Sequence, residues 1–498
     1  MFKRAPTEQS AQGLDVTDKS TLLEAPDTRT ETDFMGPREI PAAAYWGIQT
    51  LRAVENFPIT GATISAYPQL VRALAQVKHA AVLANFDLGL IDETKKEAIV
   101  RACRDLEEGR LHGQFVVDVI QGGAGTSTNM NANEVIANRA LEHLGLAKGE
   151  YSVIHPNGDV NMGQSTNDVY PTAIKIATIQ GAGELLTAMA HLYEAFARKA
   201  VEFDDVVKVG RTQLQDAVPM TLGQEFSTYA VMVDEDARRL REALVHLHEI
   251  NLGATAIGTG INTHPRYAVE ACAHLQGITG LPVVTAGNLV EATQDCGVFV
   301  LFSGMLKRVA VKLSKICNDL RLLSSGPRAG FAEINLPPRQ AGSSIMPGKV
   351  NPVIPEVVNQ VAFEVIGNDL TITLAAEAGQ LQLNAFEPII ARSLFDSLAH
   401  LTAACTTLAD HCVDGTTANK EYLRSQVEAS IGVVTILNPL IGYDAATSIA
   451  RQALSTGRSV TSLVLERGLL SADELEHILR PEHLANPQAP TAPVPTSN

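Results

Sequence analysis

Apolar side chains recur every three or four residues along several long stretches of the chain. The clearest repeat lies between residues 221 and 250, at Phe226, Ala230, Val233, Ala237, Leu240, Leu244 and Leu247. Steps that alternate between four and three residues are typical of a helix that buries one face in a bundle. We expect the charged residues of this stretch to lie on the other faces of the helix: Asp234, Glu235, Asp236, Arg238, Arg239 and Arg241.

A second long stretch shows the same seam, at Phe302, Leu306, Val309, Leu313, Ile316, Leu320 and Leu323. A third, residues 356–379, is apolar on several faces, and this predicts a helix buried at the centre of the fold. Shorter periodic stretches cover about 68–85, 90–108, 131–146 and 180–202. Strand signals are few and short, so the pattern predicts a mainly α protein with a central bundle of long helices.

The two ends of the chain lack this periodicity. Residues 1–27 are polar and rich in Thr, Glu and Asp, which predicts a disordered extension. The tail from residue 481 is rich in proline, and we expect it to be unfolded or extended. The apolar seams of the long helices between these ends expose more apolar surface than one layer of neighbouring helices covers. We therefore expect a homo-oligomer. A monomer with a thicker bundle is the alternative.

Composition and charge narrow the range of functions. The chain has 498 residues, of which 45% are hydrophobic, and its net charge is −16 with a pI near 5.3. Such an acidic protein is disfavoured as a partner of nucleic acid or of anionic membranes. No apolar stretch follows the basic residues at the N-terminus, so no secretory signal is predicted there. The longest apolar run, 297–306, is too short to span a bilayer.

The cysteines indicate a reducing compartment rather than a zinc site or a catalytic thiol. The chain has six of them, with no CxxC pair and no nearby histidine cluster of zinc-binding spacing. We interpret them as reduced core thiols of a cytoplasmic protein.

Four segments interrupt the helical pattern with dense small polar residues. They are GGAGTSTNMNANE at 122–134, GQSTND at 163–168, GRTQLQDAVP at 210–219 and GSSIMPGKVNP at 342–352. Ser, Thr and Asn at such places often only cap helix ends. Gathered together, the same hydroxyls and amides would form a pocket with one fixed cation, Lys349, suited to a small dicarboxylate. The spacing alone leaves both interpretations open.

Other chemistries lack their motifs. The chain contains no HExxH motif and no GxSxG elbow, and its glycines at 122, 123 and 125 do not have the spacing of a dinucleotide fingerprint. The segment at 342–352 is not a phosphate loop, because five residues separate Gly342 from Gly348 and Val350 follows Lys349.

The four polar segments resemble the signature blocks of one superfamily. GSSIMPGKVNP matches the form GSxxMPxKxNP of the fumarase/aspartase superfamily, and GAGTSTNMNANE, QSTND and GRTQLQDAVPMTLGQEF resemble its other blocks in order. The resemblance runs from about residue 28 to about residue 479. It implies a mixed N-terminal domain at 28–164, a long-helix bundle at 165–420 and a small helical C-terminal domain at 421–480. It also implies a homotetramer in which each active site is shared between three subunits.

The resemblance implies a reaction and a set of site residues. The reaction is the reversible elimination of ammonia from L-aspartate to fumarate through an enediolate-type intermediate. Ser343 is then the general base, and loop backbone N–H groups, with Gly342 and Gly348, stabilise its alkoxide. Substrate-binding roles fall to Thr126, Ser165, Thr166 and Ser344 at one carboxylate, to Lys349, Asn351 and Thr212 at the other, to Asn167 with help from Thr126 at the amino group, and to Gln213.

One position separates members of the superfamily. Fumarases resemble GRTHLQDA and pair that histidine with a glutamate after the loop, whereas this chain has Gln213 and keeps Glu356. The dyad would protonate a leaving hydroxide, so its loss disfavours a hydratase. It affects an ammonia-lyase less, because the protonated amino group leaves more readily as ammonia. The resemblance therefore favours the aspartase branch, although some aspartases carry histidine here. The alternatives are a fumarate hydratase, a lyase for a substituted aspartate, and a non-catalytic member such as some lens crystallins.

The implied partners are small molecules: L-aspartate, fumarate and ammonia. The mechanism needs no organic cofactor, and activation by a divalent metal such as Mg²⁺ stays open.

Overall fold

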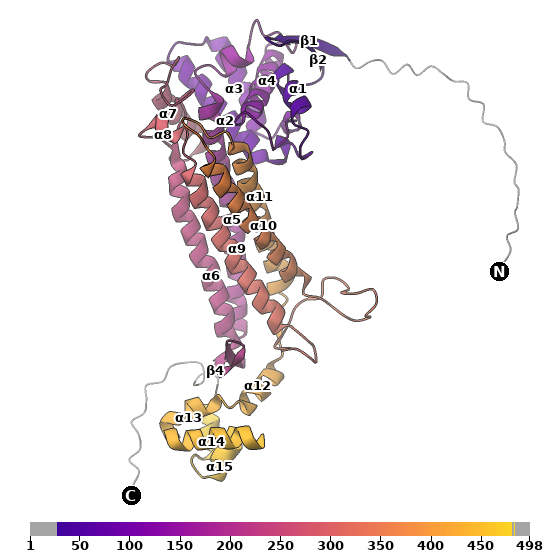
Figure 1. The fold of residues 1–498 in the computed structure, drawn as a ribbon, viewed down its shortest axis with the longest axis vertical. Helices are drawn as coiled ribbons and strands as arrows, with labels where there is room; N and C mark the ends of the chain where they lie inside the picture. Colours follow the sequence, from indigo (N-terminus) through magenta and orange to yellow (C-terminus); the bar gives the residue numbers. More distant parts are fainter. Residues whose placement is uncertain (1–26, 481–482, 484–498) are drawn as a thin grey trace, which may run out of the picture.

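The computed structural model describes residues 27–480 and residue 483. Nearly all of the predicted disordered extension and of the proline-rich tail lies outside these residues. The described chain forms three parts along one long axis: a mixed head, a bundle of long helices and a small helical foot (Figure 1).

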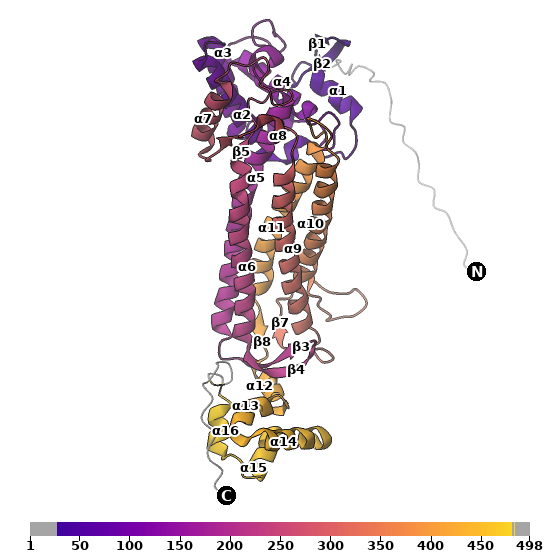
Figure 2. The ribbon, with the colours of Figure 1, turned by 60° about the vertical axis from the view of Figure 1, so that its left-hand side comes forward.

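The head is built mainly from the first part of the chain. It begins with an antiparallel hairpin of β1 (Thr28–Asp33) and β2 (Gly36–Pro41). Helices and turns follow: α1 (Ile48–Asn56), η1 (Ile64–Ala66), α2 (Pro68–Asp87), α3 (Glu93–Glu107), η2 (His112–Gln114), α4 (Thr126–His143) and η3 (Pro156–Val160). Later segments return to the head: η4 (Val245–His248), β5 (Glu249–Ile250), α7 (Tyr267–Thr279), β6 (Val284–Thr285) and α8 (Leu289–Ala292). Figure 2 shows α7 and α8 beside α2 and α4.

The bundle consists of five long helices. They are α5 (Thr166–Glu202), α6 (Leu222–Leu244), α9 (Gly297–Leu323), α10 (Val353–Glu377) and α11 (Glu387–Leu408). The apolar seam predicted for α6 is buried except for the half-buried Leu244, and all seven predicted seam residues of α9 line the core. With 37 residues, α5 is about 55 Å long, so its two ends lie at opposite ends of the bundle.

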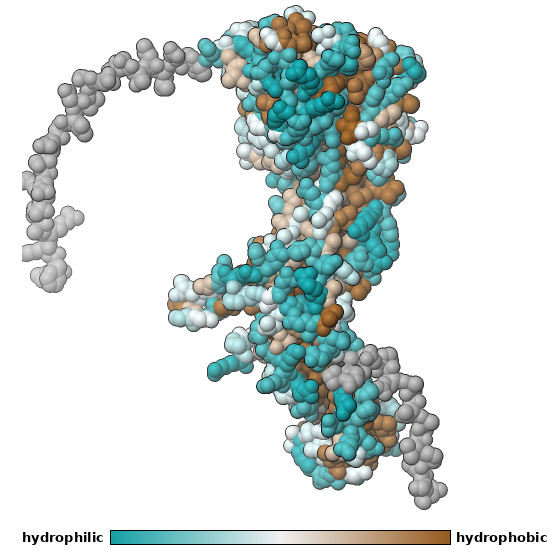
Figure 3. Space-filling model, turned by 180° about the vertical axis from the view of Figure 1, so that it is seen from behind, coloured by the Kyte–Doolittle hydropathy of each residue, from teal (hydrophilic) through white to brown (hydrophobic). Residues whose placement is uncertain are grey.

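Two predictions about burial in the bundle are wrong within the chain. Asp236 is buried rather than solvent-facing, because Arg308 and Lys312 of α9 pair with its carboxylate at 2.7 and 3.0 Å. Helix α10 is not centrally buried: Phe363 is 62% exposed and Leu370 and Leu374 are 60% exposed. Figure 3 shows apolar surface continuing from the head onto the bundle.

The foot hangs below a second hairpin, β3 (Val207–Thr212) with β4 (Gln215–Thr221). A bridge of β7 (Ile334–Asn335) with β8 (Thr417–Ala418) lies near it, and the π-helical turn η5 (Ala409–Val413) extends α11. The foot itself contains α12 (Lys420–Ala429), α13 (Val433–Ile441), α14 (Tyr443–Thr456), α15 (Val460–Glu466) and α16 (Ala472–Ile478). The small apolar core of the foot includes Val207 and Val209 of this hairpin, and these contacts connect the foot to the bundle.

The six cysteines are all buried and free, as expected for core thiols. Among the described helices, none combines the length and apolarity required to cross a membrane.

Candidate functional site

The first group of predicted site residues lies where α5 begins. Ser165 is the N-cap of α5, and its hydroxyl oxygen accepts from the N–H of Asn167 at 3.3 Å. Asp168 completes a capping box by accepting from the N–H of Ser165 at 2.9 Å. The hydroxyl hydrogen of Ser165 stays available at a helix N-terminus, where backbone dipoles favour a bound anion.

Asp168 locks this helix start to the head. Its other oxygen accepts from the N–H groups of Gly253 and Thr255, both at 3.0 Å. Burial raises the pKa of Asp168 to about 6, and the N–H donors around it oppose that rise. The loop after β5 is thereby fixed against the start of α5. Asn167 reinforces the contact, because its Nδ2 donates to the carbonyl of Ala256 at 2.7 Å.

Thr126 joins this group from the start of α4. Gly123, Ala124 and Gly125 precede it with φ values of +85°, +55° and +87°, a left-handed run that turns the chain sharply into the helix. A Cβ on Gly125 would stand 2.4 Å from the ring of Tyr170, so only glycine lets α4 start this close to α5. The Thr126 hydroxyl donates to the carbonyl of Gly123 at 2.7 Å.

The second group, Thr212 and Gln213, lies at the tip of the hairpin β3–β4 and is exposed. Gln213 and Leu214 form its two-residue turn with φ values of +54° and +62°. Hairpin turns of this kind usually hold Asn and Gly, because the left-handed region costs other residues about 1 kcal/mol or more each. Side chains below the turn hold the hairpin in place.

Those supporting side chains form a buried ionic network. The ammonium of Lys208 lies between Glu225 and Glu333, at 2.5 and 2.6 Å. Arg211 also pairs with Glu333, and its guanidinium lies over the ring of Phe331 at 4.4 Å from the centroid. The network links the hairpin to α6 and to the segment that leads into the third group.

The third group occupies a loop that projects from the side of the bundle between α9 and α10 (Figure 1). The loop closes at its base, where the N–H of Gly342 donates to the carbonyl of Lys349 at 2.8 Å and Asn351 Nδ2 donates to the carbonyl of Gly342 at 3.1 Å. A Cβ on Gly342 would stand 2.7 Å from the Lys349 oxygen, so this closure requires glycine. The chain turns at Gly348 with φ +83°.

Ser343 sits just inside the closed base. Its Oγ accepts from the N–H groups of Ile345 and Met346, each at 3.2 Å. These donors stabilise negative charge on that oxygen, while Gly342 and Gly348 shape the turn rather than supply the N–H groups. Ser344 and Lys349 are exposed, and no ion pair holds Lys349 among the described residues.

The three groups do not meet within one chain. The first lies at the head end of α5, the second follows its far end, and the third lies on the loop at the lower part of the bundle (Figure 2). The predicted site residues are therefore each placed on an ordered turn or helix start, in three separate places.

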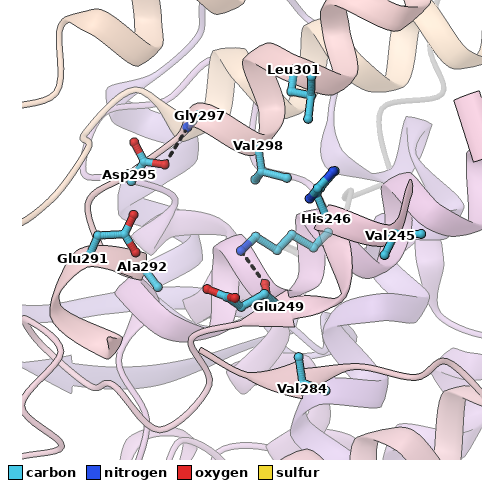
Figure 4. A pocket seen from close by; sticks show the side chains of 11 residues that line it. Val245, His246, Glu249, Val284, Glu291, Ala292, Asp295, Gly297, Val298 and Leu301 are labelled. Carbon is cyan, nitrogen blue, oxygen red and sulfur yellow. Dashed lines mark hydrogen bonds between the residues drawn. The ribbon is translucent and has the colours of Figure 1, made fainter. Parts of the chain in front are cut away.

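A cavity of about 390 Å³ lies elsewhere in the head and contains none of them. Figure 4 shows Glu249, Glu291 and Asp295 around it, together with a lysine ammonium that donates to the carbonyl of Glu249. That lysine is Lys175, at 2.7 Å. Among the described residues, no group of three or more His, Cys, Asp and Glu side chains is arranged to hold a metal ion.

The side chains behind the first group were not predicted from the sequence. Asn129 donates to the Thr166 hydroxyl oxygen at 3.1 Å, and Asn161 and Lys78 lie behind Asn129. Asn129 belongs to the polar segment 122–134, which was the available signal. Lys78 stands inside an apolar helical stretch, where a buried lysine gives no sequence signal.

Comparison with known families gives two matches. A family described as Lyase matches residues 36–367, and one described as Fumarase C C-terminus matches residues 433–486.

Three curated relatives, all named aspartate ammonia-lyase, cover nearly the whole chain. The protein of Pseudomonas fluorescens is 61% identical over 94% of this chain and 98% of its own length. That of Helicobacter pylori (strain 26695) is 59% identical over 93% and 98%. That of Escherichia coli (strain K12) is 55% identical over 92% and 96%.

Two solved structures share the fold. A fumarate lyase:delta crystallin from Brucella melitensis, bound to cobalt, matches with a TM-score of 0.90 and 57% identity, covering 93% of this chain and all (100%) of that one. A class II fumarase from Schistosoma mansoni matches with a TM-score of 0.87 and 34% identity, covering 92% and 99%. Identity is thus higher to the ammonia-lyases than to this fumarase.

Proposed function

The chain belongs to the fumarase/aspartase superfamily, and we propose that it is an aspartate ammonia-lyase, a carbon–nitrogen lyase that reversibly converts L-aspartate to fumarate and ammonia. The observation that carries the proposal is its identity of more than half to aspartate ammonia-lyases over nearly its whole length. Gln213 supports the proposal, because it stands at the position where fumarases carry the histidine of the His–Glu dyad.

The hydrogen bonds of the first group sort its residues into donors and acceptors. The oxygens of Ser165 and Thr166 already accept from protein N–H groups, so their hydroxyl hydrogens are free to donate to a carboxylate. Thr126 and Asn167 already donate to carbonyls, so their oxygens are free to accept from an ammonium. We assign the first pair to the carboxylate beside the reacting carbon and the second pair to the amino group.

Ser343 is the proposed base. It removes the proton from the carbon beside the side-chain carboxylate, and the N–H groups of Ile345 and Met346 offset the charge on its oxygen. The electrons then delocalise into that carboxylate, which Ser165, Thr166 and Ser344 stabilise. Ammonia leaves as the double bond of fumarate forms.

The other carboxylate is assigned to Lys349, Asn351 and Thr212, with Gln213 nearby. Lys349 supplies a charge without a competing ion pair among the described residues. Asn351 uses one Nδ2 hydrogen on the Gly342 carbonyl and keeps the other for the substrate. Closure of the 342–352 loop would bring Ser343 and Lys349 onto the substrate together.

We also propose that the enzyme is a homotetramer whose sites are shared between subunits. The separation of the three groups supports this, because no single chain brings them within reach of one small substrate. The exposed apolar face of α10 supports it as well, since such a face is normally covered by a partner. Six buried free thiols support a reducing, cytoplasmic location.

The experiment that tests the activity supplies L-aspartate and L-malate separately and follows fumarate by its ultraviolet absorbance. Fumarate from aspartate alone, with equal ammonia, is the expected result. Fumarate from malate alone would instead indicate a hydratase, and fumarate from neither would favour a substituted aspartate or a non-catalytic protein.

The proposed chemistry needs no organic cofactor, since side chains and backbone amides of this chain supply each step. Activation by a divalent metal such as Mg²⁺ is tested by dialysis against EDTA. A rate that falls and returns with Mg²⁺ supports activation, and an unchanged rate contradicts it.

A further inference from the structure

A chain of buried polar side chains runs behind Thr166. It starts at Lys78 of α2, which is fully buried and whose ammonium donates to Asn161 Oδ1 at 2.7 Å. Asn161 follows the turn η3, and its Nδ2 donates to the carbonyl of Gln164 at 3.2 Å. Both ends of the Asn161 amide therefore have partners.

Asn129 of α4 carries the chain onward to the site. Its Nδ2 donates one hydrogen to Asn161 Oδ1 at 3.2 Å and the other to Thr166 Oγ1 at 3.1 Å. Asn129 is 2% exposed and Thr166 is 8% exposed, so water does not compete for these bonds.

The direction of every bond in this chain follows from Lys78. In its ammonium form Lys78 only donates, so Asn161 turns its oxygen toward Lys78 and its nitrogen toward the Gln164 carbonyl. That oxygen only accepts, so Asn129 must present its NH₂ group; a flipped Asn129 would set two oxygens against each other. Thr166 then receives a hydrogen bond on its oxygen, and its own hydrogen points away from Asn129.

We propose that Lys78 is a positioning residue that fixes the direction of the Thr166 hydroxyl through Asn161 and Asn129, so that Thr166 always donates to the substrate carboxylate. The inference rests on the proposed function, because it deepens the role of the same site. A donor fixed before the reaction costs no reorientation when charge develops on the carboxylate. A reversed Thr166 would present only a lone pair to that carboxylate and repel it.

Packing alone does not explain why Lys78 is fully buried. Lysine is almost never fully buried without a pairing charge, and Lys78 makes no ion pair within 4.0 Å among the described residues. Burial lowers its pKa to about 7, while the negative charge of Asp168 opposes that fall. The rival interpretation is structural: Lys78 only balances the charge of Asp168.

A matched pair of variants separates the two interpretations. Asn161→Asp keeps an acceptor in front of Lys78 and Asn129, so these two bonds keep their direction, and it loses only the hydrogen bond to the Gln164 carbonyl. Asn129→Asp has no hydrogen to give Thr166, which must turn its own hydrogen inward. Both variants add one negative charge in the same cluster.

We expect Asn129→Asp to lower kcat/KM for L-aspartate by about tenfold more than Asn161→Asp does, because a hydrogen bond to a charged group is lost and a repulsion replaces it. Equal losses in the two variants would overturn the proposal, since an added charge or a loosened fold affects both alike.

The Thr166→Val background tests whether the effect passes through the hydroxyl. In that background Asn129→Asp and Lys78→Met should cause little further loss, because there is no hydroxyl left to orient. Full additive losses would mean that these residues act by charge or by stability instead. Lys199→Met is the control: Lys199 is likewise a buried lysine, but it lies on α5, where it pairs with Glu202 and donates to the Thr416 carbonyl at the far end of the bundle.

The failure of the inference and of the proposed function are distinguishable. A wild-type protein that makes no fumarate from aspartate refutes the function. An active wild type with equal Asn129→Asp and Asn161→Asp variants refutes only the role of Lys78. If Lys78→Met does not fold, the asparagine pair still decides.

Discussion

At the scale of single residues, the two N–H groups on Ser343 distinguish it from the other hydroxyls of its loop. Ser344 is exposed and receives no such pair of donors among the described contacts, although it stands next to Ser343. The polar signature predicted both serines as site residues but not this difference between them, because the difference depends on the backbone of the turn at 345–346.

Ser343→Ala should fold like the wild type and lose activity by about a thousandfold, within the usual range for removing a general base. Ser344→Ala is the matched control and should lose about tenfold, as expected for one donor among several. Fumarate absorbance gives both rates, and size-exclusion chromatography checks the assembly. Near wild-type rates for Ser343→Ala would show that another group takes the proton.

Glu387 sets a pH dependence of stability. Burial raises the pKa of this carboxyl from 4.5 to about 8, and the charge of Lys175 opposes the rise. Between these two values the folded state holds a proton that the unfolded state has lost, so stability falls as the pH rises through that window. Below it both states are protonated, and above it both are ionised.

Glu387→Gln removes this titration. We expect the Tm of the variant to gain several degrees relative to the wild type between pH 5 and pH 8.5, because only the wild type loses a bound proton on unfolding at pH values below about 8. Thermal melts at both pH values measure the difference. A constant gap between the two proteins would contradict the raised pKa.

At the scale of elements, apolar periodicity predicted the interiors of helices better than their starts. The pattern indicated helices from about 131 and 180, whereas α4 begins at Thr126 and α5 at Thr166. The missing turn of α4, residues 126–130, consists mainly of Thr, Ser and Asn, which carry no apolar repeat. The missing part of α5 begins with Thr166, Asn167 and Asp168, and residues 169–179 are buried on every face, so they show no single apolar seam. Asp236 was misplaced for a different reason: its partners Arg308 and Lys312 are distant in sequence.

The hairpin β3–β4 shows strain that the sequence did not reveal. Leu214 has φ +62° and is 64% exposed, so it bears the cost of a left-handed conformation and buries little surface. Leu214→Gly should therefore raise the unfolding free energy by up to about 1 kcal/mol, since relief of strain exceeds the entropy cost of glycine. Val218→Gly in β4 is the control and should destabilise. Chemical denaturation measures both, and a destabilised Leu214→Gly would refute strain at the turn.

At the scale of the whole molecule, the separation of the proposed site residues within one chain predicts an assembly of several chains. The donors and acceptors proposed for the substrate lie in the head, the proposed base and cation lie on the loop, and a third proposed set lies at the hairpin, so the three sets are far apart in one chain. The sequence pattern predicted the central burial of α10, and within the chain this is wrong because Phe363, Leu370 and Leu374 are exposed. Both facts have one explanation if neighbouring subunits pack on α10 and contribute to each site.

Mixing two variants of low activity tests that explanation directly. Ser343→Ala damages the loop and Thr166→Val damages the start of α5, so a site that takes these parts from different chains regains an intact pair in some hybrids. Denaturing the two variants together and refolding them at equal concentration should restore about a quarter of wild-type activity, because each part is intact with even odds. The variants refolded separately and then mixed are the control. Absence of recovery in hybrids that chromatography shows to be tetramers would mean that the loop and the start of α5 act within one chain, and the shared site would have to be abandoned.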